Sequence, residues 1–362
     1  MRARFASARF YINGENITPK LAPFLESVKY SDSIEGEADT VEITLTDDTH
    51  NLLKEWAPAR GSSVRVELVK TSWNSRNLTE ELPELVLPLG VFEVDEITDK
   101  YPPSVRVIKL NSIPNKANVR GVHKNRSWER TRLSRIAADI AGDAGLTLFY
   151  DAPDDPEVSR IEQADESDLA FLKKICTDAG LNVKVSDGKL IIFDAQKYEE
   201  KPVVFVLNYG ETIILSFDAA NSITNLYKDA HVHFKSNNIA DFLFGMFGEF
   251  DLLEGVSGVN LSGAVEGLTG GAGDRVLEIN QKVFSKIDAD RLAKKKLREK
   301  NKDEIKITFN LMGSFSFCAG NTIRLQGHGM YDGKYLIDKS DHTLGSSGYT
   351  TQVSLHKCLT GY

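Results

Sequence analysis

The chain has few cysteines and no long apolar run. Its 362 residues contain three cysteines, Cys176, Cys318 and Cys358. An odd number so far apart is unlike a disulfide framework or a zinc site built from Cys-x-x-Cys pairs, so a reducing compartment suits the sequence best. No stretch approaches the roughly 20 apolar residues of a membrane span, and the basic start runs into a strand pattern without the apolar stretch of a signal peptide. We expect synthesis in the bacterial cytoplasm without ordinary secretion.

The chain also has fewer basic than acidic residues. Lys and Arg total 44 against 52 Asp and Glu, which gives a formal net charge of −8. This balance disfavours a general phosphate-binding surface, so specific nucleic-acid binding is not expected. The hydrophobic content of 41% and the length are enough for two or three domains with cores of their own.

Motifs that mark catalysis are missing as well. The Gly-rich run at 270–275 lacks the Lys and hydroxyl of a nucleotide loop, and no Gly-x-Ser-x-Gly occurs. His231 and His233 share one side of a predicted strand, a spacing that can bind a metal, but no further ligand is marked, so paired surface histidines are favoured. A glycosidase whose two carboxylates are distant in sequence would leave no local pattern and stays open. We predict a chain that is not an enzyme, with no cofactor, metal or catalytic residue.

The first hundred residues alternate between apolar and polar positions, which is typical of an antiparallel sheet with one buried face. Asn13-Gly14 marks a hairpin turn between two strands. A short helix over 49–56 and an exposed loop over 73–84 interrupt the pattern. We predict a tube-like β-barrel over residues 1–112. The positions that share a strand face are Val41, Ile43 and Leu45; Val64, Val66 and Leu68; and Val105 and Val107.

Residues 113–198 change to helical spacing and predict a small α+β domain. Ser127 is a candidate N-cap for a helix that ends at Gly145. The sequence around Gly145 recurs around Gly180, which indicates two helix–strand units, although a good helix exit could also recur by chance. Asp187-Gly188 then marks a hairpin between the last two strands.

Alternation returns over 199–362, where we predict a second tube-like β-barrel. An apolar and Gly-rich insertion interrupts it at about 237–275, and a helix follows at about 285–302. The basic run at 294–298 in this helix is interpreted as a solvated face. The alternating positions near the end are Ile305, Ile307 and Phe309; Ile323 and Leu325; Tyr335 and Ile337; and Thr351, Val353 and Leu355.

Several short signatures, spread over nearly the whole chain, resemble the phage late control protein D family, the baseplate hub proteins of contractile tails. They are Asn13-Gly14-x-x-Ile-Thr; Tyr30-x-Asp-x-x-Glu-Gly-Glu-Ala-Asp39; Gly90-x-Phe-Glu-Val-Asp-Glu-Ile97; Trp128-Glu-x-x-x-Leu-x-x-Ile-Ala; Glu166-Ser-Asp-Leu-Ala-Phe-Leu172; Gly333-x-Tyr-x-Ile-Asp-x-x-x-His342; and Gly348-Tyr-x-Thr351-x-Val-x-Leu355. The segment from Trp128 to Leu172 is the most specific of them.

The resemblance implies an α+β, mostly β fold: two tube-type antiparallel barrels with a small LysM-like α+β domain between them. It implies a structural hub of a phage tail or tail-like particle, in which a homotrimer presents a pseudo-sixfold ring. The partners implied are the tail tube protein, the trimeric central spike and surrounding baseplate proteins, with the tape measure protein as a further candidate.

The insertion supplies the candidate partner-contact residues, because an apolar patch left in water favours association. These residues are Phe242, Leu243, Phe244, Met246, Phe247 and Phe250. A helix that covers its own barrel would explain them equally well. Two other functions remain as alternatives: a peptidoglycan-binding or wall-degrading protein that uses the middle domain, and a membrane-active protein that uses 242–250, although this segment lacks a basic polar face.

Overall fold

The structure is a computed structural model. It describes residues 5–34, 38–47, 58–71, 83–113, 121–222, 226–227, 229–233, 258–260, 275–279 and 286–359. The predicted short helix at 49–56, most of the loop at 73–84 and the candidate residues between Phe242 and Phe250 lie outside these ranges. The fold is mostly β, as predicted, with large antiparallel sheets.

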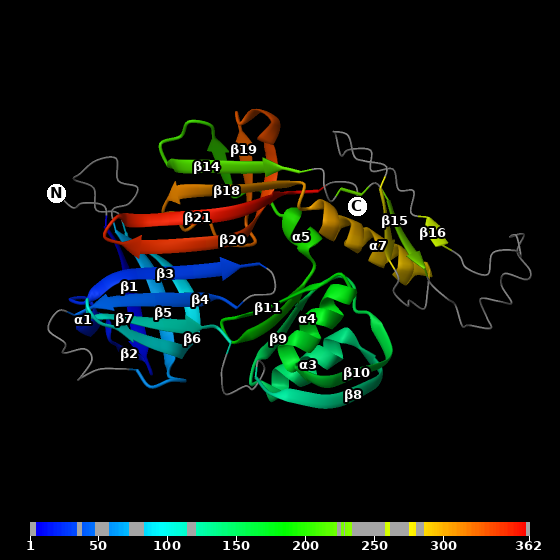
Figure 1. The fold of residues 1–362 in the computed structure, drawn as a ribbon, viewed down its shortest axis with the longest axis horizontal. Coiled ribbons are helices and arrows are strands. Elements are labelled where there is room, and N and C mark those ends of the chain that lie inside the picture. The colour runs from blue at the N-terminus through cyan, green and yellow to red at the C-terminus, as the bar shows by residue number, and fades with distance from the viewer. Residues whose placement is uncertain are drawn as a thin grey trace, which may run out of the picture.

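The first barrel-like unit is a curved sheet with strand order β3-β4-β7-β6-β5-β1-β2 (Figure 1). Its elements are β1 (Phe5–Ile12), β2 (Glu15–Asn16), α1 (Thr18–Leu21), β3 (Leu25–Ser33), β4 (Thr40–Thr46), β5 (Ser63–Thr71), β6 (Leu85–Lys100) and β7 (Val105–Asn111). Asn13 and Gly14 have positive φ between β1 and β2, which confirms the predicted hairpin. Val105 and Val107 do share a face, but the core side of β7 is that of Ile108 and Leu110.

The middle unit repeats a strand–helix–strand pattern twice. The elements are β8 (His123–Arg132), α3 (Leu133–Asp143), β9 (Thr147–Asp151), then β10 (Glu157–Ser167), α4 (Asp168–Asp178), β11 (Asn182–Ser186), followed by β12 (Lys189–Phe193) and α5 (Ala195–Glu199). β8 pairs with β10, and both helices end at a glycine of positive φ, Gly145 and Gly180. The two predicted units are therefore present, each with one strand more than expected.

The predicted N-cap at Ser127 is wrong. Ser127 lies within β8, opposite Glu162 of β10, because these strands run straight into their helices. The N-terminus of α3 is bound instead by Asp155, from the loop between β9 and β10, which accepts from Ser134 N at 2.9 Å and from Ser134 Oγ at 2.7 Å. The second helix, α4, does carry a cap of its own, since Ser167 Oγ accepts from Ala170 N.

The second barrel-like unit contains the C-terminal strands predicted from the alternation. Its elements are β13 (Phe205–Asn208), β14 (Ile214–Asn221), β18 (Ile305–Met312), β19 (Thr322–Gln326), the short 3-10 helix η2 (Gly329–Tyr331), β20 (Gly333–Gly345) and β21 (Gly348–Lys357). Between β14 and β18 lie β15 (Asp229–His233), β16 (Gly258–Asn260), β17 (Val276–Ile279) and α7 (Lys286–Asn301). Helix α7 packs on β15, where Leu292, Ala293 and Leu297 form a small apolar cluster with Ala230 and Val232.

The two barrel-like units have the same strand order. In the first it is β3-β4-β7-β6-β5-β1, and in the second β14-β18-β21-β20-β19-β13. The corresponding strands also follow one another in the same chain order. The one difference in direction is that β1 pairs antiparallel to β5, whereas β13 pairs parallel to β19.

The correspondence extends to single residues of β6 and β20. Gly90 lies opposite Val66 of β5, and Gly333 lies opposite Leu325 of β19. Both glycines have positive φ and both open the pattern Gly-x-aromatic-x-aliphatic-Asp, which ends at Asp95 in one copy. The bulge in the β6–β7 ladder falls between Val94 and Glu96, and the one between β20 and β21 falls between Ile337 and Lys339. Since bulges are positional features of a strand pair, their coincidence indicates that the two units repeat one design.

The two units share a sheet because β3 pairs with β20. Strand β19 pairs with β20 only as far as Leu336. Beyond that point β3 pairs with the same edge of β20, with Lys339 opposite Ser33 and His342 opposite Tyr30. We call this pairing the seam. In Figure 1 the strands from β14 at the top through β18, β21, β20 and β3 to β4 lie side by side.

A buried histidine lies at the centre of the seam. His342 stacks on Tyr30 and on Tyr349, with ring centroids 5.9 and 6.0 Å away. Its Nδ1 is 2.7 Å from Tyr349 Oη, and its Nε2 is 3.0 Å from Ser340 Oγ. Burial lowers the pKa of His342 to about 4, so the ring is neutral at pH 7.

This environment predicts an acid-sensitive seam. A histidine in the unfolded chain accepts a proton near pH 6.5, whereas folded His342 does so near pH 4. Its contribution to stability is therefore complete above pH ~6.5 and is lost as the pH falls towards 4. His342→Gln, which stays neutral, is expected to lose less stability than the wild type over that interval in urea titrations. If both proteins lost the same free energy of unfolding between pH 6.5 and 4, His342 would not be the source of the acid sensitivity.

Candidate functional site

A buried ion cluster joins the middle unit to both barrel-like units. Lys184 of β11 places its Nζ 2.6 Å from Asp32 Oδ1 and 2.9 Å from Asp39 Oδ1. Ser186 Oγ donates to Asp39 Oδ2 at 2.5 Å, and the backbone N–H of Ala319, which precedes β19, donates to Asp32 Oδ2 at 3.0 Å. One lysine and two carboxylates thus connect three segments that are distant in sequence. We call this group the acidic joint.

The charges of the acidic joint depend on one another. Burial and, to a lesser degree, the neighbouring Asp32 raise the pKa of Asp39, Lys184 and the hydrogen bond from Ser186 oppose them, and the balance leaves this pKa at about 6. Burial acts to lower the pKa of Lys184, but the two carboxylates outweigh it and leave that pKa above its ordinary value. Lys184 is therefore charged at neutral pH, and without it two carboxylates would face each other away from water.

A second joint connects α5, α7 and the second barrel. Glu199 of α5 forms an ion pair with Arg298 of α7, accepts from His356 Nε2 at 3.1 Å and accepts from the backbone N–H of Leu359 at 2.7 Å. The other ring nitrogen of His356 is 2.6 Å from Asp338. Burial alone would lower the pKa of His356. Hydrogen bonds to the two carboxylates outweigh burial and raise this pKa to about 9, so the ring is a cation at pH 7.

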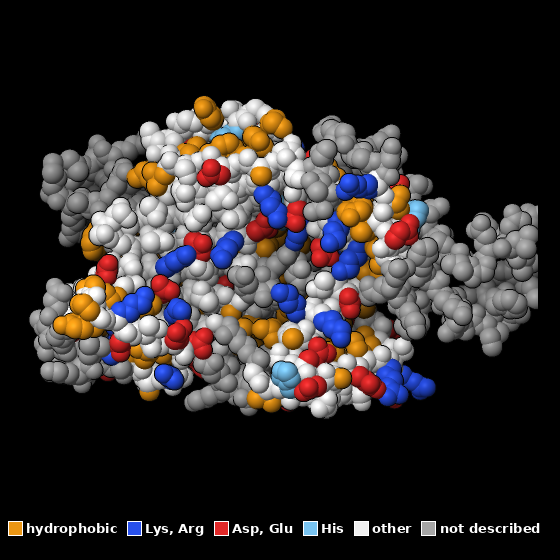
Figure 2. Space-filling view, in the orientation of Figure 1, with side chains coloured by type: hydrophobic (Ala, Val, Ile, Leu, Met, Phe, Trp, Pro, Cys, Tyr) orange, Lys and Arg blue, Asp and Glu red, His pale blue; other side chains and the backbone are white. Residues whose placement is uncertain are grey.

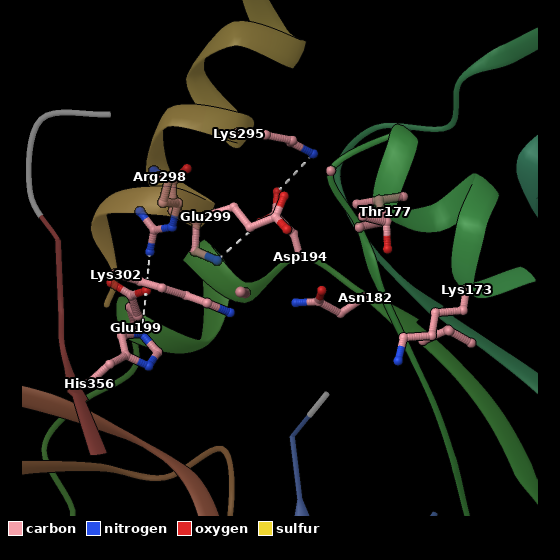
Figure 3. A pocket seen from close by; sticks show the side chains of 15 residues that line it. Lys173, Thr177, Asn182, Asp194, Glu199, Lys295, Arg298, Glu299, Lys302 and His356 are labelled. Atoms are coloured by element: carbon pink, nitrogen blue, oxygen red, sulfur yellow. Dashed lines mark hydrogen bonds and ion pairs between the residues drawn. The ribbon is translucent and has the colours of Figure 1, made fainter. Parts of the chain in front are cut away.

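Beside this joint is a pocket of about 370 Å³ between α4, α5 and α7 (Figure 3). Lys295 lies on its wall with Nζ 3.4 Å from Asp194 Oδ2. A Cβ at Gly180 would come within 2.1 Å of the Lys295 side chain, so only glycine permits this approach. The prediction of a solvated basic face is therefore wrong for Lys295 and Arg298, because both side chains turn into the contact between α7 and its neighbours.

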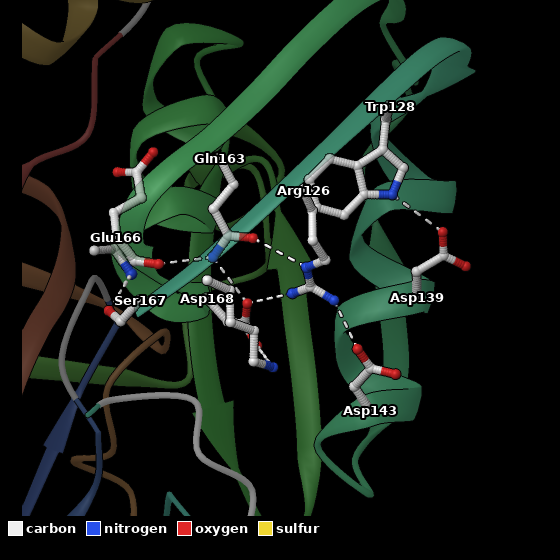
Figure 4. Close-up of polar contacts among 10 residues, drawn as sticks. Arg126, Trp128, Asp139, Asp143, Gln163, Glu166, Ser167 and Asp168 are labelled. Carbon is white, nitrogen blue, oxygen red and sulfur yellow. Dashed lines mark hydrogen bonds and ion pairs between the residues drawn. The ribbon is translucent and has the colours of Figure 1, made fainter. Parts of the chain in front are cut away.

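The most specific family signature also has a structural role (Figure 4). Asp168, fully buried at the start of α4, accepts from Lys124 Nζ at 2.6 Å and Gln163 Nε2 at 2.9 Å, and pairs with Arg126. Trp128 stacks on Phe171 with centroids 5.3 Å apart and donates to Asp139. Its indole is thus committed to contacts within the middle unit, which offers no support for a sugar platform at this residue.

His231, one of the two histidines considered for metal binding, lies in β15 with its Nδ1 3.3 Å from Glu278 Oε1. The side chain of the other, His233, is not among those that the structure describes. Within the described ranges, no three His, Cys, Asp or Glu side chains come together as a metal site. In those same ranges no helix is long and apolar enough to cross a membrane. The partner-contact hypothesis for Phe242 to Phe250 stays a prediction, since these residues are not described.

The acidic joint predicts a large cost for removing its lysine. Lys184→Met leaves Asp32 and Asp39 uncompensated and is expected to reduce the free energy of unfolding by about 3–5 kcal/mol, measured by urea denaturation. Combining it with Asp39→Asn should recover part of the loss. Lys20→Met is the matched control, since Lys20 pairs with Glu15 on the surface and should change stability by less than about 1 kcal/mol. Equal effects of Lys184→Met and Lys20→Met would contradict this account.

The second joint predicts an alkaline limit to stability. Unfolded histidine loses its proton near pH 6.5 and folded His356 near 9, so its contribution is complete below pH ~6.5 and is lost as the pH rises through 9. His356→Gln should be destabilised at pH 6, with a deficit that shrinks towards pH 10. A deficit independent of pH between 6 and 10 would show that His356 acts without its charge.

Comparisons with known proteins agree with this architecture. The family model described as phage tail baseplate hub (GPD) matches residues 118–348. A probable baseplate hub protein of Escherichia phage 186 is 30% identical over 188 residues, which cover 51% of this chain and 44% of the relative. The chain thus aligns with less than half the length of that relative.

Solved structures share the fold across nearly the whole chain. The 43 kDa tail protein of prophage MuSo2 from Shewanella oneidensis superposes with a TM-score of 0.69 at 13% identity, covering 98% of this chain and 99% of that one. The Escherichia coli c3393 protein, a component of the type VI secretion system, gives a TM-score of 0.57 at 11% identity, covering 98% of this chain and 78% of that one. Because the family model matches well over half of the chain, the chain belongs to the phage tail baseplate hub (GPD) family.

Proposed function

We propose that three copies of this chain form a ring that adapts a sixfold tail tube to a trimeric central spike. The observation that carries the proposal is the duplication: one chain holds two barrel-like units with the same strand order, and β6 and β20 carry a bulge and a glycine at corresponding positions. Three chains then supply six similar units, so a threefold ring presents nearly sixfold symmetry to the tube.

The joints support a rigid adaptor. The seam and the acidic joint hold both units and the middle unit through backbone pairing and buried charge, so the angle between them is set within each chain. In the ring, the middle unit would lie outside as an attachment for surrounding baseplate proteins. The apolar segment at 239–273 would contact the tube or the spike. Charges of both signs alternate over the face in Figure 2, which favours protein neighbours over a phosphate backbone.

The mass of the purified chain in solution tests the proposal. Native mass spectrometry is expected to find three copies in one particle, either alone or after mixing with the tube and spike proteins of the same particle. Particles of three chains bound to one spike trimer would be the strongest support. A chain that stays monomeric with both partners would contradict the adaptor function and would favour the peptidoglycan-binding alternative.

A further inference from the structure

The pocket beside the second joint lies where three parts of the chain meet (Figure 3). Helix α4 and strand β11 of the middle unit form one wall, α5 forms another, and the end of α7 together with His356 of β21 forms the third. Its volume of about 370 Å³ falls within the range of small-molecule sites, about 300–1,000 Å³. A molecule bound in it would contact the middle unit, α7 and the second barrel-like unit at once.

The described lining of this pocket carries more positive than negative charge, although the chain as a whole has a net charge of −8. Five basic side chains and three carboxylates line it. The basic side chains are those of Lys173, Lys295, Arg298, Lys302 and His356. Since His356 is a cation at pH 7, all five are charged, and the pocket favours an anionic occupant.

The three carboxylates already have partners within the chain. Glu199 belongs to the second joint, where it is bound by a guanidinium, an imidazole and a backbone N–H. Glu299 pairs with Lys296 at 3.0 Å, and Asp194 caps α5 by accepting from the backbone N–H of Gln196 at 3.0 Å. The positive charge that remains in the pocket is therefore carried by its lysines.

Lys295 has charged neighbours but no hydrogen bond. Its Nζ lies 3.4 Å from Asp194 Oδ2 and 3.8 Å from Asp154 Oδ2, yet it is buried and donates to no residue that the structure describes. An ammonium group has three donors, and leaving them unused in a buried position is unfavourable. Figure 3 shows the side chains of Lys302 and Asn182 pointing into the same space from opposite walls. Donors from both walls thus converge on this space.

We propose that the pocket binds a small anion with two or more acidic groups, such as a diphosphate or a tricarboxylate. Ammonium and amide groups donate to carboxylate and phosphate oxygens, and such charge-assisted hydrogen bonds are strong. A second acidic group allows one ligand to reach both Lys302 after α7 and Lys173 of α4. A nucleobase finds no free platform among the described lining residues, because His356, their only aromatic ring, is bound by carboxylates at both nitrogens.

The bound anion would fasten α7 to the middle unit. The two are already in close contact at this point, where Lys295 approaches Gly180. A ligand that bridges them would hold the middle unit at one angle to the second barrel-like unit. The described lining residues all belong to one chain, so this inference goes beyond the proposed function and can fail or succeed independently of the ring.

Isothermal titration calorimetry of the full chain tests the pocket, with pyrophosphate and citrate as probes at pH 7, constant ionic strength and without divalent cations. One saturable site per chain is expected for at least one probe, and the probe that binds identifies the acidic groups. Lys302→Met should weaken binding about tenfold, because it removes one charged hydrogen bond. Lys173→Met, a change of an exposed side chain, is the second variant and should have the same effect if Lys302→Met does not fold.

Lys294→Met is the matched control, since Lys294 is an exposed lysine of α7 that is not part of the described lining. It should bind as tightly as the wild type. Absence of saturable binding of both anions to the wild type would overturn the inference. Equal weakening by Lys302→Met, Lys173→Met and Lys294→Met would also overturn it, because the anion would then respond to overall charge rather than to this pocket.

Discussion

The pairing of β3 with β20 is the interaction on which the rest of the structure depends. Strand β20 is longer than its partner β19, so its second half presents backbone donors and acceptors that need a strand. Strand β3 of the other unit satisfies them, and two curved sheets become one. The angle between the two units is thus determined by hydrogen-bond geometry, which is more restrictive than side-chain packing alone. The stack of Tyr30, His342 and Tyr349 fills the space at this junction and keeps water from it.

The buried charges have a related purpose. The acidic joint brings together β3, the start of β4, β11 and the loop before β19, and the second joint brings together α5, α7 and the last strands. Buried ion pairs add little net stability compared with apolar residues, but they tolerate few alternative geometries because an unpaired partner is costly. The stability of the chain should depend on pH from both sides, since His342 of the seam is buried neutral and His356 of the second joint is buried charged.

The sequence predicted the fold class, the two barrel regions and the hairpin turns, because alternation and Asn-Gly or Asp-Gly turns are local signals. The two barrels expected from the family resemblance also leave a local trace in the sequence, a repeated motif. The family signatures that begin at Gly90 and at Gly333 are two copies of one motif, which ends at Asp95 and Asp338. Asp32 and Asp39 lay in a signature whose purpose could not be seen, since their partner Lys184 is far away in sequence. The prediction that Lys295 and Arg298 face solvent was wrong because a basic run has the same sequence whether it faces water or buried carboxylates. Their partners, Asp194 and Glu199, are also distant in sequence.

The central claim is that two copies of one barrel design, held at a set angle, allow a trimer to present sixfold symmetry. Electron cryomicroscopy of the assembled ring tests this claim most directly. The account predicts that the two barrel-like units of one chain lie at the same radius and height and are related by a rotation of roughly 60° about the ring axis. Units of one chain found at different radii or stacked along the axis would contradict it.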